Sequence, residues 1–159
     1  MKDFPFQCVV DLSLGGVMPE KKTEGAAAYD LYCPKDTVIN KGRNKIPLGV
    51  RLCFPMDYQV LIEARSGFEL NGFEGYWTGD ADMCMPYRFD ADVLTGKIDS
   101  DYHREISVIV KSYENMPFVC KAGTRIAQMT FVKIDHPKFI EGSIEETTRE
   151  GFGSTGTIG

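Results

Sequence analysis

The chain has 159 residues, of which 43% are hydrophobic and 26% are charged, and this composition describes one globular domain that can bury its own core. Twenty-three acidic residues against eighteen basic ones give a net charge of −5, which argues against a surface for nucleic acid but leaves room for a local basic pocket. Five widely spaced cysteines without a CxxC pattern, and two histidines, predict neither a disulfide framework nor a protein-made metal cage. Without a signal-like start or a membrane-spanning apolar run, we expect a soluble, cytoplasmic protein with no membrane partner.

Short apolar runs separated by Gly, Pro, Asn and Asp predict β-strands, and no run has the length and period of a long helix. The expected strands are 6–12, 45–54, 58–64, 106–113 and 126–134. In the fourth, Ile106, Val108 and Val110 recur at every second position and so share one side, which is typical of a half-buried strand. We therefore expect an all-β sandwich or barrel with mostly antiparallel pairing.

The strand at 58–64 is followed by the sequence ARSGF at 64–68. Arg65, Ser66 and Gly67 together offer a guanidinium, a hydroxyl and exposed backbone N–H groups, all of which suit phosphate oxygens. Taken alone, the commoner explanation of such a short pattern is a surface turn with a solvated arginine.

The segment 71–91 is rich in Gly, Asp and aromatic residues and lacks clear periodicity, so we interpret it as a long excursion from the core. Its aromatic residues include Tyr76, Trp77, Tyr87 and Phe89, and its acidic residues include Asp80, Asp82 and Asp90. Aromatic anchors beside carboxylates favour a protein partner or a neighbouring subunit and disfavour phosphate. We expect the segment to lie near the mouth of any site formed by the sequences that flank it.

The sequence TGKIDSDY at 95–102 places a glycine turn before an apolar residue, two carboxylates and an aromatic ring. Asp99, next to Ile98, can serve as a general base for a water molecule, and Tyr102 can lie against a sugar. An aspartate-rich turn that leads into the strand at 106 is the alternative that the spacing leaves open.

Near the C-terminus, GTRIAQ at 123–128 opens an apolar strand with Arg125 and places Gln128 inside it, where a buried amide needs partners. A ligand phosphate is one candidate partner, and a cross-strand hydrogen bond is the commoner one.

The last motif, REGFGSTG at 149–156, has the glycines of a phosphate loop but lacks the lysine of a P-loop and any following helix. A flexible arm could close over a ligand, with Phe152 on a base and Arg149 on a phosphate, or the segment could be a disordered tail.

Taken in order, five segments of this chain resemble the five motifs of trimeric dUTPases. They are AAAYDLY at 26–32, ARSGF at 64–68, TGKIDSDYHREI at 95–106, GTRIAQM at 123–129 and TREGFGSTG at 148–156. The resemblance implies an all-β, jelly-roll-like barrel or sandwich subunit in a homotrimer. It also implies three active sites at subunit interfaces, exchange of the C-terminal arms, and hydrolysis of dUTP to dUMP and pyrophosphate by water attack on the α-phosphorus.

The resemblance further implies residue roles. Asp99 would orient the attacking water, and Tyr102 would pack on the deoxyribose and exclude a 2′-hydroxyl. The phosphate contacts would come from Arg65, Ser66, Gly67 and Gln128. On the hairpin, Gly96 and Ile98 would belong to the nucleoside site, with backbone groups at 93–96 at the uracil edge.

On the arm, the same resemblance implies that Phe152 covers the uracil, that Arg149 reaches the γ-phosphate, and that Gly153 and Ser154 bind substrate. Mg²⁺ would bind through the triphosphate, without protein ligands of its own.

The chain departs from the family pattern at several places. The spacing from Arg149 to Phe152 is shorter than usual, His103 and Arg104 replace a common Arg/Gln-Gly pair, and 71–91 adds residues. Two alternatives to the hydrolase remain open at this point: a dCTP deaminase-like relative, and a binding or regulatory protein that uses 71–91 to contact a partner.

Overall fold

The structure is a computed structural model that describes residues 4–149 and 151. Within these residues the chain forms short β-strands and one six-residue helix, α1 (Ser66–Asn71), which confirms the all-β prediction. The strands are β1 (Val9–Asp11), β2 (Tyr29–Tyr32), β3 (Thr37–Ile39), β4 (Gly42–Pro47), β5 (Arg51–Cys53), β6 (Tyr58–Glu63), β7 (Phe73–Trp77), β8 (Tyr87–Phe89), β9 (Ala91–Val93), β10 (Gly96–Ile98), β11 (Ser107–Ser112), β12 (Phe118–Cys120) and β13 (Arg125–Lys133).

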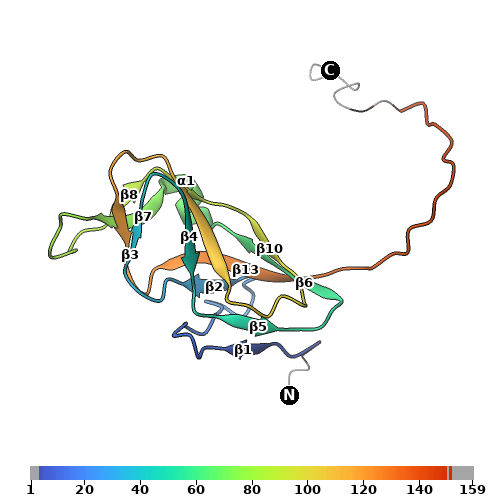
Figure 1. Ribbon diagram of the computed structural model, residues 1–159, viewed down its shortest axis with the longest axis horizontal. Helices are drawn as coiled ribbons and strands as arrows, with labels where there is room; N and C mark the ends of the chain where they lie inside the picture. Colours follow the sequence, from blue (N-terminus) through green and yellow to red (C-terminus); the bar gives the residue numbers. More distant parts are fainter. Residues whose placement is uncertain (1–3, 150, 152–159) are drawn as a thin grey trace.

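The strands assemble into four small sheets, whose arrangement can be followed in Figure 1. Their orders are β10-β6-β13-β2, β3-β12-β7-β8, β4-β11-β9 and β1-β5. Their buried apolar side chains form one hydrophobic core. The pairings between named strands are antiparallel, as the short strand spacing predicts. In the part of the chain that is described, no helix is long and apolar enough to cross a membrane.

The alternation read from the sequence at 106–113 matches the burial of β11. Ile106, Val108 and Val110 are fully buried, whereas Ile109 and Lys111 are partly exposed. Aromatic rings contribute to the core beside the sheet β3-β12-β7-β8, where Phe89 stacks on Phe118 with ring centroids 4.1 Å apart.

The predicted strand at 45–54 is two strands, β4 and β5, separated by a sharp turn at 48–50. Gly49 adopts a φ of 69°, and a Cβ built on it would lie 2.5 Å from the nitrogen of Gly16. Leu48 and Val50 are nevertheless fully buried, so apolar residues stand on both sides of Gly49 and conceal the turn. The chain bends here because two glycines allow two backbone segments to touch.

The interpretation of 71–91 as an excursion from the core is wrong for its two ends. They form the hairpin β7–β8, and Phe73 and Phe89 are both buried in the common core. Gly75 is packed so closely that a Cβ there would lie 2.9 Å from the ring of Phe118. The alternation of this strand is not apparent in the sequence, because the position midway between Phe73 and Trp77 is Gly75, which has no apolar side chain. Residues 78–86 alone form a tip outside the paired strands, and Figure 1 shows it pointing away from the body.

After β13 the chain leaves the barrel. Ile134 donates a backbone hydrogen bond to Asp57 over 2.8 Å, and the His136 ring nitrogen lies 2.8 Å from the Met56 carbonyl oxygen. Residues 137–149 are exposed and run away from the body, at the opposite end of the molecule from the hairpin tip (Figure 1). The expected arm at 148–159 lies mostly outside the described residues.

Candidate active site

The sheet β10-β6-β13-β2 has one apolar and one polar face. Gln128 on β13 pairs with Glu63 on β6 and with Asp30 on β2, and directly paired residues point to the same face of a sheet. The next pair along, Met129 and Ile62, points into the core instead. The strand register therefore collects polar side chains from three strands on one surface.

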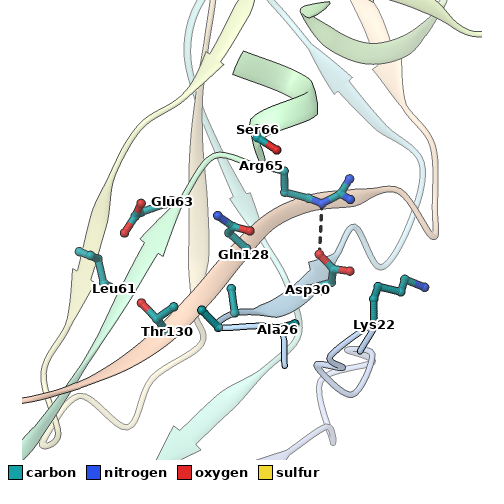
Figure 2. Close-up of a pocket in the computed structure, with 11 residues that line it drawn as sticks. Lys22, Ala26, Asp30, Leu61, Glu63, Arg65, Ser66, Gln128 and Thr130 are labelled. Atoms are coloured by element: carbon teal, nitrogen blue, oxygen red, sulfur yellow. Dashed lines mark ion pairs between the residues drawn. The ribbon is translucent and has the colours of Figure 1, made fainter. Parts of the chain in front are cut away.

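This surface forms a cavity of about 430 Å³, which we call the Asp30 pocket (Figure 2). Its lining residues are Lys22, Ala26, Ala27, Ala28, Asp30, Leu61, Glu63, Arg65, Ser66, Gln128 and Thr130. Three of the predicted phosphate-binding residues, Arg65, Ser66 and Gln128, are thus brought together from positions far apart in the sequence.

Asp30 organises the cations of this pocket. Its side chain is 11% exposed, and its two carboxylate oxygens accept separate contacts: Arg65 Nε at 3.1 Å and Arg125 Nη1 at 3.4 Å. A carboxylate with so little access to water requires charged partners. One carboxylate between two guanidiniums therefore fixes the position of Arg65 in the pocket and of Arg125, which lies outside the pocket lining.

Ser66 and Gly67 begin α1, which is separated from the end of β6 by two residues. The Arg65 carbonyl accepts backbone hydrogen bonds from Phe68 at 2.9 Å and Glu69 at 3.1 Å, which closes the turn. Figure 2 shows the Ser66 side chain beside Arg65 at the upper edge of the pocket. A Cβ built on Gly67 would meet no described atom within 4 Å, so the space beside this glycine is open.

Gln128 has a partner within the chain. Its Nε2 donates to the Ala64 carbonyl oxygen over 3.2 Å, which is the cross-strand explanation that the sequence left open. This bond holds the Ala64 carbonyl, one residue beyond β6, against β13. It thereby restrains the backbone that leads into Arg65.

The predicted hairpin residues lie elsewhere in the subunit. Asp99 is exposed and follows β10, and Tyr102, whose backbone N–H donates to the Asp99 carbonyl over 3.1 Å, is 38% exposed. Neither residue lines the Asp30 pocket. Gly96 and Ile98 are paired with Ile62 and Val60 of β6, with Ile98 packed against the core.

Tyr102 lies in a second cavity of about 420 Å³, the Tyr102 pocket. Its other lining residues are Lys45, Pro47, Arg104, Glu105 and Ser107. Within one chain, the predicted site residues therefore form two separate groups.

Of the predicted arm residues, the structure describes Arg149, and it lines neither pocket. Arg149 is exposed on the outgoing segment, and Phe152, Gly153 and Ser154 lie outside the described residues.

Comparison with known proteins identifies the family. A family model for dUTPase matches residues 90–156. A deoxyuridine 5′-triphosphate nucleotidohydrolase of Caldanaerobacter subterraneus subsp. tengcongensis is 36% identical over 145 residues, which cover 87% of this chain and 88% of the relative. The enzyme of the same name from Fowlpox virus is 35% identical, with 87% and 89% covered. The chain belongs to the dUTPase family.

Solved structures agree with this membership at the level of the fold. A Staphylococcus bacteriophage 80alpha dUTPase with dUPNHPP superposes with a TM-score of 0.75 and 22% identity, covering 95% of this chain and 99% of the other. The dUTPase from phage phi11 of S. aureus gives a TM-score of 0.68 at 20% identity, with 89% and 98% covered. The jelly-roll-like subunit expected from the motifs is the fold of this family.

At the departure from the family pattern at 103–104, the His103 ring nitrogen lies 3.1 Å from the Ser100 carbonyl oxygen. The side chain of His103 thus folds back over the turn that carries Asp99 and Tyr102.

Asp30, which pairs with the arginines at the pocket, is not among the site residues that the sequence predicts. The available signal was a carboxylate between Tyr29 and Leu31 in a strand-forming run, where an ionised group needs a partner. Its partners, Arg65 and Arg125, lie in distant parts of the sequence, so the charge pairing was not readable from local spacing.

Among the residues that the structure describes, no cluster of three or more His, Cys, Asp or Glu side chains is arranged to hold a metal ion.

Proposed function

We propose that this protein hydrolyses dUTP to dUMP and pyrophosphate. The observation that carries the proposal is the Asp30 pocket of a chain of the dUTPase family, in which a carboxylate positions the Arg65 guanidinium in a lining that also contains Ser66 and Gln128. Oriented cations and hydrogen-bond donors stabilise the charge that develops when a phosphoric anhydride is cleaved.

The phosphate half of the reaction would take place on this pocket. Arg65 and Ser66 would contact phosphate oxygens, and the open space beside Gly67 would let the backbone approach them. Gln128 would act through its pocket-facing amide while its nitrogen holds the Ala64 carbonyl. Arg125, placed by the same carboxylate as Arg65, would add positive charge.

The nucleoside half would take place on the 96–102 hairpin. Tyr102 would lie on the deoxyribose and Asp99 would accept a proton from the attacking water, with Gly96 and Ile98 beside the uracil. The exposure of Asp99 and Tyr102 in the single subunit supports a role at a surface that another copy of the chain covers.

We propose that a homotrimer completes the site, because Asp99 and Tyr102 do not line the pocket that holds Arg65 and Ser66. The outgoing segment supports exchange of C-terminal arms, since Phe139, Ile140 and Ile144 are more than four-fifths exposed on it. Arg149, Phe152, Gly153 and Ser154 would then act on a neighbouring subunit's site.

Mixing two inactive variants tests this assembly. Asp99→Asn and Arg65→Ala should each be inactive as homotrimers, and a co-refolded mixture should recover activity, because some sites would then combine an intact Asp99 with an intact Arg65. No recovery in mixed trimers, or a fully active monomer by light scattering, would contradict a shared site.

Magnesium would bind through the triphosphate. The donor set fits this arrangement, since the Asp30 carboxylate is already engaged by two arginines. When bound, Mg²⁺ would neutralise charge on the leaving pyrophosphate. A phi11 phage dUTPase variant is described with a structural Mg(II) ion.

The decisive experiment is pyrophosphate release from dUTP, with dTTP, dCTP and UTP assayed separately as alternative substrates and EDTA as the metal control. We expect kcat/KM for dUTP to exceed that for each of the other three by a large factor, and turnover to be lost in EDTA. Ammonia release from dCTP would instead support the deaminase alternative, which the hydrolase names of the curated relatives do not favour.

We also propose that the hairpin tip is a contact surface for a protein partner. Trp77, Tyr87 and Met85 are 38%, 48% and 69% exposed at the outer end of the hairpin, and Trp77 packs on Phe89 at 4.9 Å, which anchors the cluster to the core. No described residue of 72–91 lines the Asp30 pocket, so this surface is separate from the phosphate site.

A further inference from the structure

The ring of Tyr102 is held by its own hydroxyl. The Tyr102 Oη donates to the Glu105 carbonyl oxygen over 3.2 Å, three residues along the chain. The Tyr102 backbone N–H donates to the Asp99 carbonyl over 3.1 Å. Both ends of the tyrosine are thus tied within one turn, although the ring itself is exposed.

Glu105 is fixed in turn by a bond to a different part of the chain. Its carboxylate Oε2 accepts a hydrogen bond from the Gly49 backbone N–H over 2.8 Å. The neighbouring residue Ile106 donates to Val50 at 2.8 Å and accepts from Leu48 at 2.9 Å. The side chain of Glu105 therefore continues a short ladder between the 48–50 turn and the start of β11.

The anchor at Gly49 cannot move easily. Gly49 has a φ of 69°, and the Gly16 N–H donates to its carbonyl over 3.1 Å. Because the two glycines pack backbone against backbone, the N–H that faces Glu105 has one orientation.

We propose that Glu105 is a positioning residue that sets the ring of Tyr102 and thereby the discrimination against ribonucleotides. The inference rests on the proposed function, in which Tyr102 packs on the deoxyribose. A ring that excludes one hydroxyl group must be held to a fraction of an ångström, and an exposed ring has few packing contacts to hold it. The bond from the Tyr102 hydroxyl to the backbone of Glu105 supplies this restraint, and the bond from Gly49 fixes that backbone.

The test measures kcat and KM for dUTP and UTP in four single variants and in the double variant Glu105→Ala/Tyr102→Phe. Glu105→Ala removes the bond to Gly49 and should raise the ratio of UTP to dUTP kcat/KM about tenfold. The KM for dUTP should rise while kcat stays within about threefold, because Asp99 is untouched. Glu105→Gln keeps an acceptor for Gly49 and should restore the wild-type ratio.

Glu114→Ala is the matched control. Glu114 also uses its carboxylate to accept a backbone N–H, that of Asp90, over 2.8 Å, but it lies beyond the far end of β11 from Tyr102. Its loss should leave the UTP to dUTP ratio unchanged. Tyr102→Phe, which keeps the ring and loses the hydroxyl, should shift the ratio in the same direction, and its effect should not add to that of Glu105→Ala.

An unchanged ratio in Glu105→Ala, an equal shift in Glu114→Ala, or additive effects of Glu105→Ala and Tyr102→Phe would overturn the positioning role. So would Glu105→Gln behaving like Glu105→Ala. If Glu105→Ala fails to fold, the Gln and Phe variants still decide the question. Absence of dUTP turnover in the unaltered protein would overturn the proposed function itself, which separates the two failures.

Discussion

The Asp30 pocket and the turn that carries Asp99 and Tyr102 are built in different ways. In the pocket, strand register and a nearly buried carboxylate fix the side chains, so the arrangement is complete within one subunit. In the turn, backbone and side-chain hydrogen bonds fix the chain, but the reactive side chains remain exposed. The first group is therefore preorganised by folding alone, whereas the second would, under the proposed function, need a neighbouring chain to enclose it.

The largest effect should come from the exposed half. Asp99→Asn preserves the shape of the turn but removes the proton acceptor, so kcat should fall on the order of 10²-fold or more while dUTP affinity is kept. Rapid-quench turnover and equilibrium binding of a nonhydrolysable analogue measure the two quantities. A kcat near that of the unaltered protein would show that Asp99 is not the base.

A second effect concerns the arm that would close over both halves. Removal of residues 151–159 should lower kcat roughly 50-fold, because the reacting phosphate loses its cover from water. Circular dichroism and light scattering should show an unchanged fold and trimer, since a glycine-rich segment adds little to a core. Full activity in the truncated protein would show that the segment is only a tail.

The preorganised half can be tested through Asp30→Asn. With its counter-charge gone, the pair Arg65 and Arg125 should lose its fixed arrangement, and kcat/KM for dUTP should fall about tenfold. The free energy of unfolding in urea should fall by about 2 kcal/mol, because a largely buried ion pair is broken.

The exposed ion pair between Arg51 and Asp11 provides the control, since Asp11→Asn should change neither quantity measurably. Tighter dUTP binding by Asp30→Asn would show that the carboxylate competes with phosphate for the two arginines and does not position them for it.

The smallest effect should come from the hairpin tip. Replacing residues 79–85 with a two-residue Asn-Gly turn should keep dUTP hydrolysis within about tenfold, because the buried strands on either side are untouched. Replacement of the whole of 71–91 should instead destabilise the subunit, since Phe73 and Phe89 belong to the core. Loss of all activity in the short-tip variant, with the trimer intact, would place the tip in the active site.

The sequence predicted those strands that stand out as short β-rich runs between turn residues, as at 58–64 and 126–134. The buried face of 106–113 could be predicted as well, because apolar residues recur there with period two. The hairpin β7–β8 was missed because Gly75 interrupts that alternation, and α1 was missed because six residues are too few to show a helical period.

The site was predictable to the extent that it lies in contiguous motifs. Arg65, Ser66 and Gln128 do share a pocket, as ordered motifs indicated. Asp30 was not predicted as a site residue, because its importance lies in charge pairing across strands. Glu105 was not predicted either, because its partner, Gly49, is 56 residues away in the chain. Neither relation leaves a local pattern. The roles of Asp99, Tyr102 and the arm residues remain predictions for the experiments above.

The contact between Gly16 and Gly49 also has a genetic consequence. Neither glycine lines the Asp30 pocket or the Tyr102 pocket, yet a side chain at either position would push apart two backbones that now lie within hydrogen-bonding distance. The displaced turn would carry its N–H away from Glu105. A random-mutagenesis selection for clones that accept ribonucleotides should therefore recover substitutions at these two remote loop positions, alongside the expected ones at the sugar-facing residue.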